Sequence, residues 1–309
     1  MAKPGRRFLM ASAVALALTG CAAPITTAGV SAPIGGADRL YVSIGDSYAA
    51  GYRPSPDGSG STTTDGFAYQ VAADPRVTGR PLELVNFGCA GVTSTALREN
   101  PGCAAGASGP GAPAYPRQAQ VDAAVAFITG NRERIALVTV VVGGNDIKPC
   151  VQRPDGAPRP DATACLAEAG KALRANLAIL LGALRSAVGP TTPIVGVTYP
   201  DVYLGAWVAT TPGARDLAVA SVALFRDQLN PALRAEYSAV GALFADITAA
   251  TGGYGPLEEI VDDPTYGKIP NPVARLCALT YYCRLRDVHP TVDGHRVIAD
   301  RIVELAHLS

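Results

Sequence analysis

The chain has 309 residues, a formal net charge of zero and only 17% charged residues. It has neither a surplus of basic residues nor a run of like charges, which argues against a protein that binds nucleic acid. The length beyond the N-terminal segment suits one globular domain whose core needs no structural metal. We expect a monomer without a nucleic-acid partner.

The first twenty residues have the features of an export signal. Basic residues fall within the first seven positions, residues 8–18 are mostly apolar and uncharged, and Leu18-Thr19-Gly20-Cys21 looks like a bacterial lipobox. The apolar stretch is shorter than the ~20 residues that span a bilayer. Residues 1–20 are therefore predicted to be a lipoprotein signal peptide, and Cys21 to carry a membrane-anchoring lipid. The alternative is a plain secretory signal with an incidental cysteine, and either signal places the protein outside the cytoplasm.

Two further segments follow the signal. Residues 21–38 are rich in Ala, Thr, Gly and Pro without periodicity, which is typical of a flexible tether. Residues 39–309 contain no low-complexity linker and no evident repeat, so we predict that they form one domain.

The pattern of apolar residues within this domain predicts an α/β fold. Fully apolar runs are typical of parallel strands buried on both faces, and they occur at residues 40–44, 82–86, 135–142, 193–199 and 240–246. Helical spacing of apolar residues occurs between and after these runs, at 166–184, 214–237 and 298–305. Alternating strands and helices predict a central parallel sheet with helices on both faces, a three-layer sandwich of the flavodoxin-like kind.

Four short motifs carry the chemistry. They are Gly45-Asp46-Ser47-Tyr48, the segment 86–91, Gly143-Gly144-Asn145-Asp146 and Asp287-Val288-His289-Pro290. The first three follow predicted strands, and α/β sheets bind ligands at the carboxyl ends of their strands. A serine, oxyanion donors and a histidine gathered at one edge are the parts of an acyl-transfer site.

The order and residue types of these motifs resemble those of the SGNH, or GDSL, hydrolase family, and the resemblance covers nearly the whole chain after residue 39. It implies a serine esterase or lipase that acts on a small-molecule or lipid ester, forms an acyl-enzyme and uses no metal or organic cofactor. Ser47 would be the nucleophile and His289 the general base. The backbone N–H groups of Ser47 and Gly91 and the side-chain amide of Asn145 would hold the oxyanion.

Simpler structural roles are the alternatives for several of these residues. Ser47 could belong to a helix cap, Asn145 could be a turn residue, and we interpret Gly88 as an ordinary turn glycine. His295 is more consistent with packing than with catalysis.

The third catalytic residue is less clear from the sequence. The family usually has an acid three residues before the histidine, where this chain has Arg286. Asp287, two residues before His289, is our candidate. It could instead cap the following helix, with a backbone carbonyl orienting His289, and Arg286 could pair with its carboxylate.

Six cysteines remain after Cys21, and they permit many pairings. They form three close pairs along the chain, so local pairing is the simplest arrangement, and it resembles the three-bridge pattern of secreted actinobacterial relatives. The predicted disulfides are Cys89–Cys103, Cys150–Cys165 and Cys277–Cys283. A zinc site is the alternative, but the chain has no CxxC motif and no histidine near the first two pairs.

The substrate is not readable from the sequence. Residues 52–65, 99–116 and 199–207 are predicted to border the pocket. A carboxylesterase or lipase is the first candidate function, and a deacetylase of envelope glycans is the second. An acyltransferase of envelope glycans or lipids and a non-catalytic binding module are also compatible with these motifs.

Overall fold

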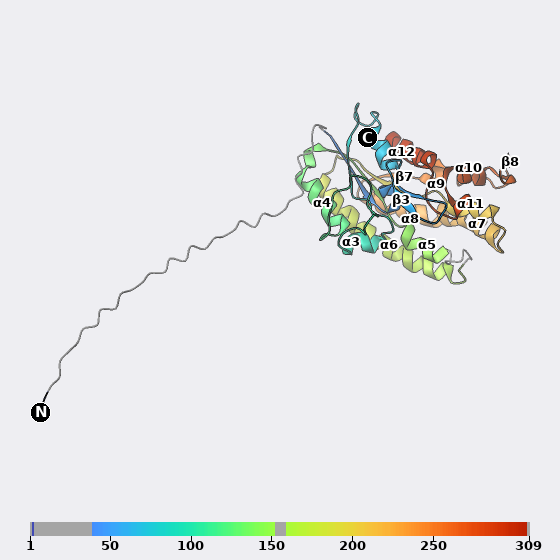
Figure 1. Cartoon of the computed structure of the whole chain (residues 1–309), viewed down its shortest axis with the longest axis horizontal. Helices are drawn as coiled ribbons and strands as arrows, with labels where there is room; N and C mark the ends of the chain where they lie inside the picture. Colours follow the sequence, from blue (N-terminus) through green and yellow to red (C-terminus); the bar gives the residue numbers. More distant parts are fainter. Residues whose placement is uncertain (1, 3–38, 152–158, 308–309) are drawn as a thin grey trace. The chain divides into compact units, whose positions relative to one another are not determined.

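The computed structural model describes residue 2, residues 39–151 and residues 159–307 of the chain (Figure 1). The expected tether and Cys21 lie outside the described residues, as does the expected signal peptide apart from residue 2. Among the described residues, none of the helices is both long and apolar enough to cross a bilayer.

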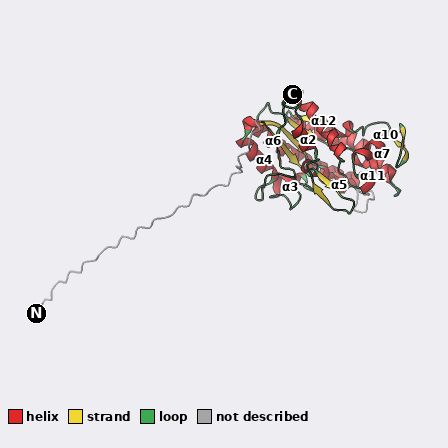
Figure 2. Ribbon diagram, turned by 45° about the horizontal axis from the view of Figure 1, so that its top comes forward, coloured by secondary structure: helices red, strands yellow, loops and turns green. Residues whose placement is uncertain are grey.

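A five-stranded parallel sheet forms the centre of the domain, with strand order β4-β1-β5-β6-β7. Figure 2 shows strands in yellow among the red helices. Each of its strands falls within, or within one residue of, an apolar run that predicts it. The strands are β1 (Leu40–Gly45), β4 (Glu83–Asn86), β5 (Ile135–Val141), β6 (Ile194–Val197) and β7 (Leu243–Ala245). Every residue of β1 and β5 is buried, as expected for strands covered on both faces.

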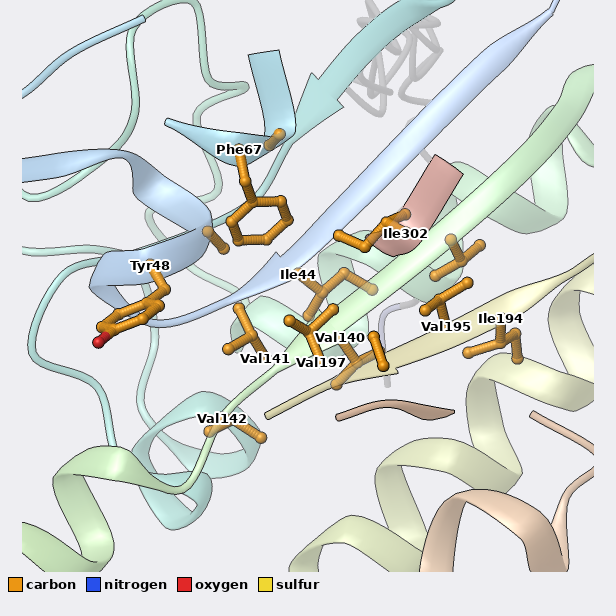
Figure 3. Packing of buried hydrophobic residues seen from close by; sticks show 14 of the residues in the cluster. Ile44, Tyr48, Phe67, Val140, Val141, Val142, Ile194, Val195, Val197 and Ile302 are labelled. Atoms are coloured by element: carbon orange, nitrogen blue, oxygen red, sulfur yellow. The ribbon is translucent and has the colours of Figure 1, made fainter. Parts of the chain in front are cut away.

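Helices cover both faces of this sheet and complete the predicted three-layer sandwich. On one side, α12 (Val292–His307) packs against β6 and β7. The helices α2 (Phe67–Ala73) and α9 (Ile247–Ala250) pack against α12. A second layer consists of α3 (Ser94–Glu99), α4 (Gln120–Gly130), α6 (Ala162–Val188) and α8 (Asn230–Ala239). In the core, Phe67 of α2 and Ile302 of α12 lie among Ile44, Val140 and Val195 of the strands (Figure 3).

The remaining elements are short and lie in the connections. The helical ones are α1 (Ser47–Ala50), η1 (Arg132–Arg134), α5 (Gly144–Val151), η2 (Val202–Val208), α7 (Ala214–Ala223), η3 (Leu224–Leu229), α10 (Asn271–Leu279) and α11 (Tyr282–Leu285). Two antiparallel hairpins pair β2 (Tyr52–Pro54) with β3 (Gly60–Thr62) and β8 (Ile260–Asp263) with β9 (Gly267–Pro270).

The helix predicted at 214–237 has a π-helical turn in its middle. α7 runs into the π-helical segment η3, which continues as α8, and the Asn230 N–H donates to the Phe225 carbonyl five residues back. Pro231 follows directly; it lacks an N–H, and its ring would crowd a carbonyl four residues earlier in a regular α-helix. The wider turn relieves this conflict, and π-turns of this kind occur frequently at functional sites.

Candidate active site

Ser47 lies at the end of β1, where the chain turns into α1. Gly45 has φ +145°, and a Cβ atom there would lie 2.0 Å from the Val141 carbonyl oxygen, so only glycine lets β1 end this close to β5. The Asp46 carboxylate accepts a hydrogen bond from the Tyr48 N–H at 2.9 Å and caps α1. The cap is therefore Asp46, and Ser47 is the first residue of the helix.

Gln120 fixes the turn before Ser47, although no sequence motif indicates this role. The Gly45 N–H donates to Gln120 Oε1 at 2.8 Å, and Gln120 Nε2 donates to the Gly45 carbonyl at 3.0 Å. Both bonds are buried and join residues that are 75 positions apart, so no local pattern predicts them.

The motifs at the two ends of the domain meet at Ser47. His289 Nε2 lies 2.7 Å from Ser47 Oγ, and His289 Nδ1 lies 2.6 Å from Asp287 Oδ1. The same Asp287 oxygen accepts the His289 backbone N–H at 2.9 Å. Serine, imidazole and carboxylate thus form one continuous hydrogen-bonded line, in which the imidazole can move a proton to or from the serine.

The alternative interpretation of Asp287 as a helix cap is wrong. α12 begins at Val292, and the side-chain oxygen of Thr291 accepts a hydrogen bond from the Gly294 N–H at 3.1 Å, so Thr291 supplies the cap. The carboxylate of Asp287 bonds instead to the backbone N–H and the ring Nδ1 of His289.

Arg286 is directed to an aromatic ring. Its guanidinium lies 5.9 Å from the centre of the Tyr282 ring, and its backbone is left-handed with φ 57°, ending α11.

Burial alone would raise the pKa of Asp287. The hydrogen bonds and charge of His289, with a smaller effect of the Lys148 charge, outweigh burial, and the pKa of Asp287 is lowered. The carboxylate therefore stays ionised at neutral pH.

Two tyrosines hold the histidine segment against the serine helix. The Tyr48 hydroxyl donates to the Val288 carbonyl at 2.6 Å, which links α1 to the residue before His289. The Tyr52 ring lies 4.5 Å from the His289 ring, measured between centroids. These contacts join segments about 240 positions apart, so the sequence singles out Tyr48 only through its place in the first motif.

Two of the three predicted oxyanion donors are Gly91, which lies in a loop, and Asn145, which lies at the start of α5, and these two segments are bonded together. Asn145 Nδ2 donates to the Val92 carbonyl at 2.9 Å, which orients the amide and leaves its second hydrogen available. The Asp146 carboxylate accepts from the Ser94 N–H at 2.9 Å and from the Ser94 hydroxyl at 2.6 Å. The loop that carries Gly91 is thereby attached to the start of α5.

The two glycines of the second motif are needed for different reasons. Gly91 has φ +87°, a conformation that disfavours side chains, whereas a Cβ atom there would meet no protein atom within 4 Å. Gly88 is not the ordinary turn glycine that we expected. Its Cβ atom would lie 2.6 Å from the Ala50 nitrogen, so this glycine allows the loop to pack directly on α1.

Asp46 is a buried acid next to Ser47, close to the hydrogen-bonded residues Ser47, His289 and Asp287. Besides capping α1, it accepts a hydrogen bond from the Tyr199 hydroxyl at 2.6 Å. Burial raises the pKa of Asp46 to about 6, although the bonds from Tyr199 and Tyr48 and the charge of His289 partly offset this rise. Above that pH, Asp46 adds negative charge near the imidazole.

His295 has the packing role that we expected. It is buried, its Nδ1 accepts the Phe67 N–H at 3.2 Å, and burial lowers its pKa to about 3. The ring therefore stays neutral at physiological pH.

The structure has the three predicted disulfides, so the described cysteines form no zinc site. Cys89–Cys103 closes the loop that contains Gly91, and Cys277–Cys283 joins α10 to α11 just before Asp287. Cys150–Cys165 connects α5 with α6. Each of the three bridges therefore restrains a segment that carries or directly precedes a candidate site residue.

A pocket opens beside Ser47 and Asn145, and the prediction of its walls was only partly correct. Residues 199–207 contribute four lining residues, whereas residues 52–65 contribute none, and Tyr52 lies instead against the His289 ring. Residues 99–116 supply none of the residues that line this pocket. Its remaining apolar wall comes from residues that the sequence did not indicate, namely Ile147, Leu173, Phe225, Leu229 and Leu233.

Asp201 caps η2, which forms part of the pocket wall. Its burial predicts that the stability of the protein depends on pH. It is fully buried and accepts the Ser221 hydroxyl at 2.8 Å, and burial raises its pKa from the ordinary 3.8 to about 7. Because the folded state favours the protonated form, this stabilisation is complete below about pH 4 and is lost as the pH rises to about 7.

Asp201→Asn should keep the hydrogen bonds, because the amide can donate to Ser221 while the Ser221 hydroxyl donates to the Ala218 carbonyl. The variant should therefore gain about 2–4 kcal/mol relative to the wild type between pH 4 and pH 8. Urea unfolding at pH 4, 6 and 8 measures the difference. Parallel stability curves for the two proteins would contradict the assignment.

Comparison with known proteins agrees with this geometry. The model of the GDSL-like lipase/acylhydrolase family matches residues 43–297. The chain belongs to this family. Membership makes it a serine hydrolase acting on ester bonds.

Solved structures support the same fold. An extracellular lipase from Streptomyces rimosus has a TM-score of 0.50 at 19% identity, covering 86% of this chain and 99% of that one. The lipase Lip_vut3 from a goat rumen metagenome also has a TM-score of 0.50, at 14% identity, covering 87% of this chain and 98% of that one. No curated protein was found to match the chain.

Proposed function

We propose that the chain is an esterase that hydrolyses carboxylic esters through an acyl-enzyme on Ser47. The observation that carries this proposal is the hydrogen-bonded line from Ser47 Oγ through His289 to the Asp287 carboxylate. Ser47 Oγ bonds to the ester carbonyl carbon while its proton passes to His289 Nε2. The C–O bond to the alcohol then breaks, and the alcohol leaves with that proton. Water, activated by His289, attacks the acyl-enzyme and releases the acid.

The oxyanion formed in each step would be held by the Ser47 N–H, the Gly91 N–H and the free amide hydrogen of Asn145. Two hydrogen bonds support this role, because Asn145 Nδ2 donates to the Val92 carbonyl and the Ser94 N–H donates to the Asp146 carboxylate, which hold the loop of Gly91 against the start of α5 before substrate binds. Donors fixed in advance stabilise developing charge without reorganising during the reaction. Asp287 would hold His289 in the tautomer that leaves Nε2 free to accept a proton.

We further propose that the enzyme acts outside the cytoplasm, as residues 39–309 joined by a tether to a lipid on Cys21. The lipobox-like segment supports anchoring, and three disulfides fit an oxidising compartment. A domain tethered at a membrane would meet lipid esters and acylated envelope glycans. Esterase or lipase activity comes first, with deacetylation or acyl transfer as alternatives.

Activated esters provide the direct test. The purified chain should release nitrophenol and free acid from nitrophenyl esters, and a phosphonate ester should label Ser47 with the expected mass increase. An added alcohol distinguishes hydrolysis from acyl transfer, because a transferase would form the new ester in preference to the acid. Absence of both acid and new ester would reject the proposal.

Asn145→Ala should lower kcat by about 10²–10³-fold, as expected when one oxyanion donor is lost. KM should change much less, because the donor acts mainly when charge develops on the carbonyl oxygen. Steady-state kinetics with a nitrophenyl ester measures both values. An effect confined to KM would mean that Asn145 only positions the substrate.

A further inference from the structure

The pocket beside Ser47 is small, and side chains from several separate helices line its apolar side. Its volume is about 50 Å³. A cavity of roughly 10–15 Å³ holds one water molecule, so this pocket has room for about three to five groups of that size. Ser47 and Asn145 line it, and its apolar wall includes Phe225, Leu229 and Leu233.

This pocket lies on the acyl side of the reacting ester. The alcohol must leave next to His289, which protonates it, and the His289 ring faces Tyr52. Neither His289 nor Tyr52 lines the pocket, whereas Asn145, the oxyanion donor, does. An ester whose carbonyl oxygen points to Asn145 and whose alcohol lies near His289 therefore places its acyl chain in the pocket.

A second, larger space lies behind the pocket wall. A groove of about 310 Å³ runs between α6 and the η3–α8 segment. Four apolar side chains line both the pocket and the groove, and so separate them: Ile147, Leu173, Leu229 and Leu233. Leu224 lines the groove but not the pocket.

The π-helical turn helps to build this separation. η3 spans Leu224–Leu229, and Phe225 and Leu229 within it both line the pocket. Leu229 is half-buried, unlike the fully buried Leu173 and Leu233, so it is the member of the wall that can be shortened with least disturbance of the core.

We propose that Leu229 and its three partners limit the enzyme to short acyl groups, from acetyl to butyryl, by closing the pocket off from the groove. This inference rests on the proposed esterase function and specifies its substrate class. A butyryl group extends three carbons beyond the carbonyl and fills the pocket, whereas a longer chain meets the leucine wall. The enzyme is thus a short-chain carboxylesterase, and truncation of Leu229 opens a path for longer chains.

The test is a series of nitrophenyl esters with acyl chains from acetyl to dodecanoyl, hydrolysed by the full chain. For the wild type, kcat/KM should rise about fourfold per added methylene up to butyryl, as expected for apolar burial, and fall from hexanoyl onwards. In Leu229→Ala the rise should continue to octanoyl, with at least a tenfold increase in the octanoyl-to-butyryl ratio. Leu229→Val is a milder variant that should shift the profile in the same direction, should the alanine variant fold poorly.

Leu224→Ala is the matched control, because it removes the same atoms from the same helical turn on the groove side only. It should keep the wild-type profile. A second series, with acetyl esters of longer alcohols, should respond equally in all variants. The inference is overturned if the wild type hydrolyses dodecanoyl and butyryl esters equally, if both alanine variants shift alike, or if Leu229→Ala changes only the alcohol preference.

Failure of this inference is distinguishable from failure of the esterase proposal. Ser47→Ala should abolish hydrolysis of every ester in the series. If it does so while the Leu229 variants leave the acyl profile unchanged, only the inference about chain length is wrong. If Ser47→Ala retains the activity, the esterase assignment itself fails.

Discussion

Replacing Ser47 by alanine should lower kcat on the order of 10³-fold or more while leaving the fold intact. The substitution removes one oxygen atom, and the backbone of α1 is capped by Asp46, so the helix does not depend on the serine hydroxyl. His289→Ala should have a similar effect, because the serine is a weak nucleophile without a base 2.7 Å from its oxygen. The measurement is steady-state kinetics on nitrophenyl acetate, together with a thermal unfolding curve for each variant.

Ser186→Ala is the matched control for the serine substitution. Ser186 lies exposed on α6 and its hydroxyl bonds to the Gly182 carbonyl of its own helix. This variant should keep full activity. A double variant lacking both Ser47 and His289 should lose little more than either single variant, because the two side chains act in one step. More than a tenth of the activity remaining in Ser47→Ala would reject the site.

The sheet and the positions of the motifs could be predicted from the sequence for a physical reason. Strands buried on both faces need apolar residues at every position, so runs such as 135–142 stand out from the half-polar helices. Once the strands are known, the carboxyl edge of the sheet gathers the segments that follow them. Strand positions alone therefore bring Ser47 and Asn145 to the same edge.

Contacts between distant segments account for what the sequence could not supply. Gln120 clamps Gly45, and Tyr48 bonds to the carbonyl of Val288, yet neither residue has a local pattern that points to its partner. The pocket wall is a similar case. Leu229 has the spacing of an ordinary core leucine, and only the fold, which brings it together with Ile147 and Leu173 at the pocket wall, makes it part of the site.

The structure was also needed to decide between two possible roles of a single residue. The sequence Asp-Val-His-Pro is compatible with a helix cap, because an acid a few residues before a helix commonly has that role. The observed start of α12 at Val292, with Thr291 as its cap, leaves the Asp287 carboxylate to His289. Gly88 shows the same limit, since a glycine required by close packing cannot be told from a turn glycine by its neighbours.

Asp287→Asn should lower kcat by about 10⁴-fold, as in other catalytic triads. The carboxylate accepts the His289 Nδ1 hydrogen at 2.6 Å, which leaves Nε2 free to take the serine proton. An asparagine amide can present its N–H to the ring and favour the opposite tautomer, and it also removes the charge that stabilises the imidazolium. Asp287 Oδ1 accepts both the ring Nδ1 hydrogen and the backbone N–H of His289, so an amide that turns its N–H to the ring also gives up the bond to the backbone N–H.

Asp293→Asn is the control for this change, because it removes the same charge from an exposed residue in the first turn of α12. It should leave kcat within about twofold, because an exposed charge at a helix start affects stability, by only about 0.3–1 kcal/mol, and takes no part in the proton transfer. Rates measured from pH 5 to 9 add a second criterion. The lowered pKa of Asp287 keeps its carboxylate ionised across this range, so the deficit of Asp287→Asn should be nearly independent of pH. A loss within about tenfold would instead show that Ser47 and His289 work as a dyad, with the Asp287 carboxylate needed only for the turn.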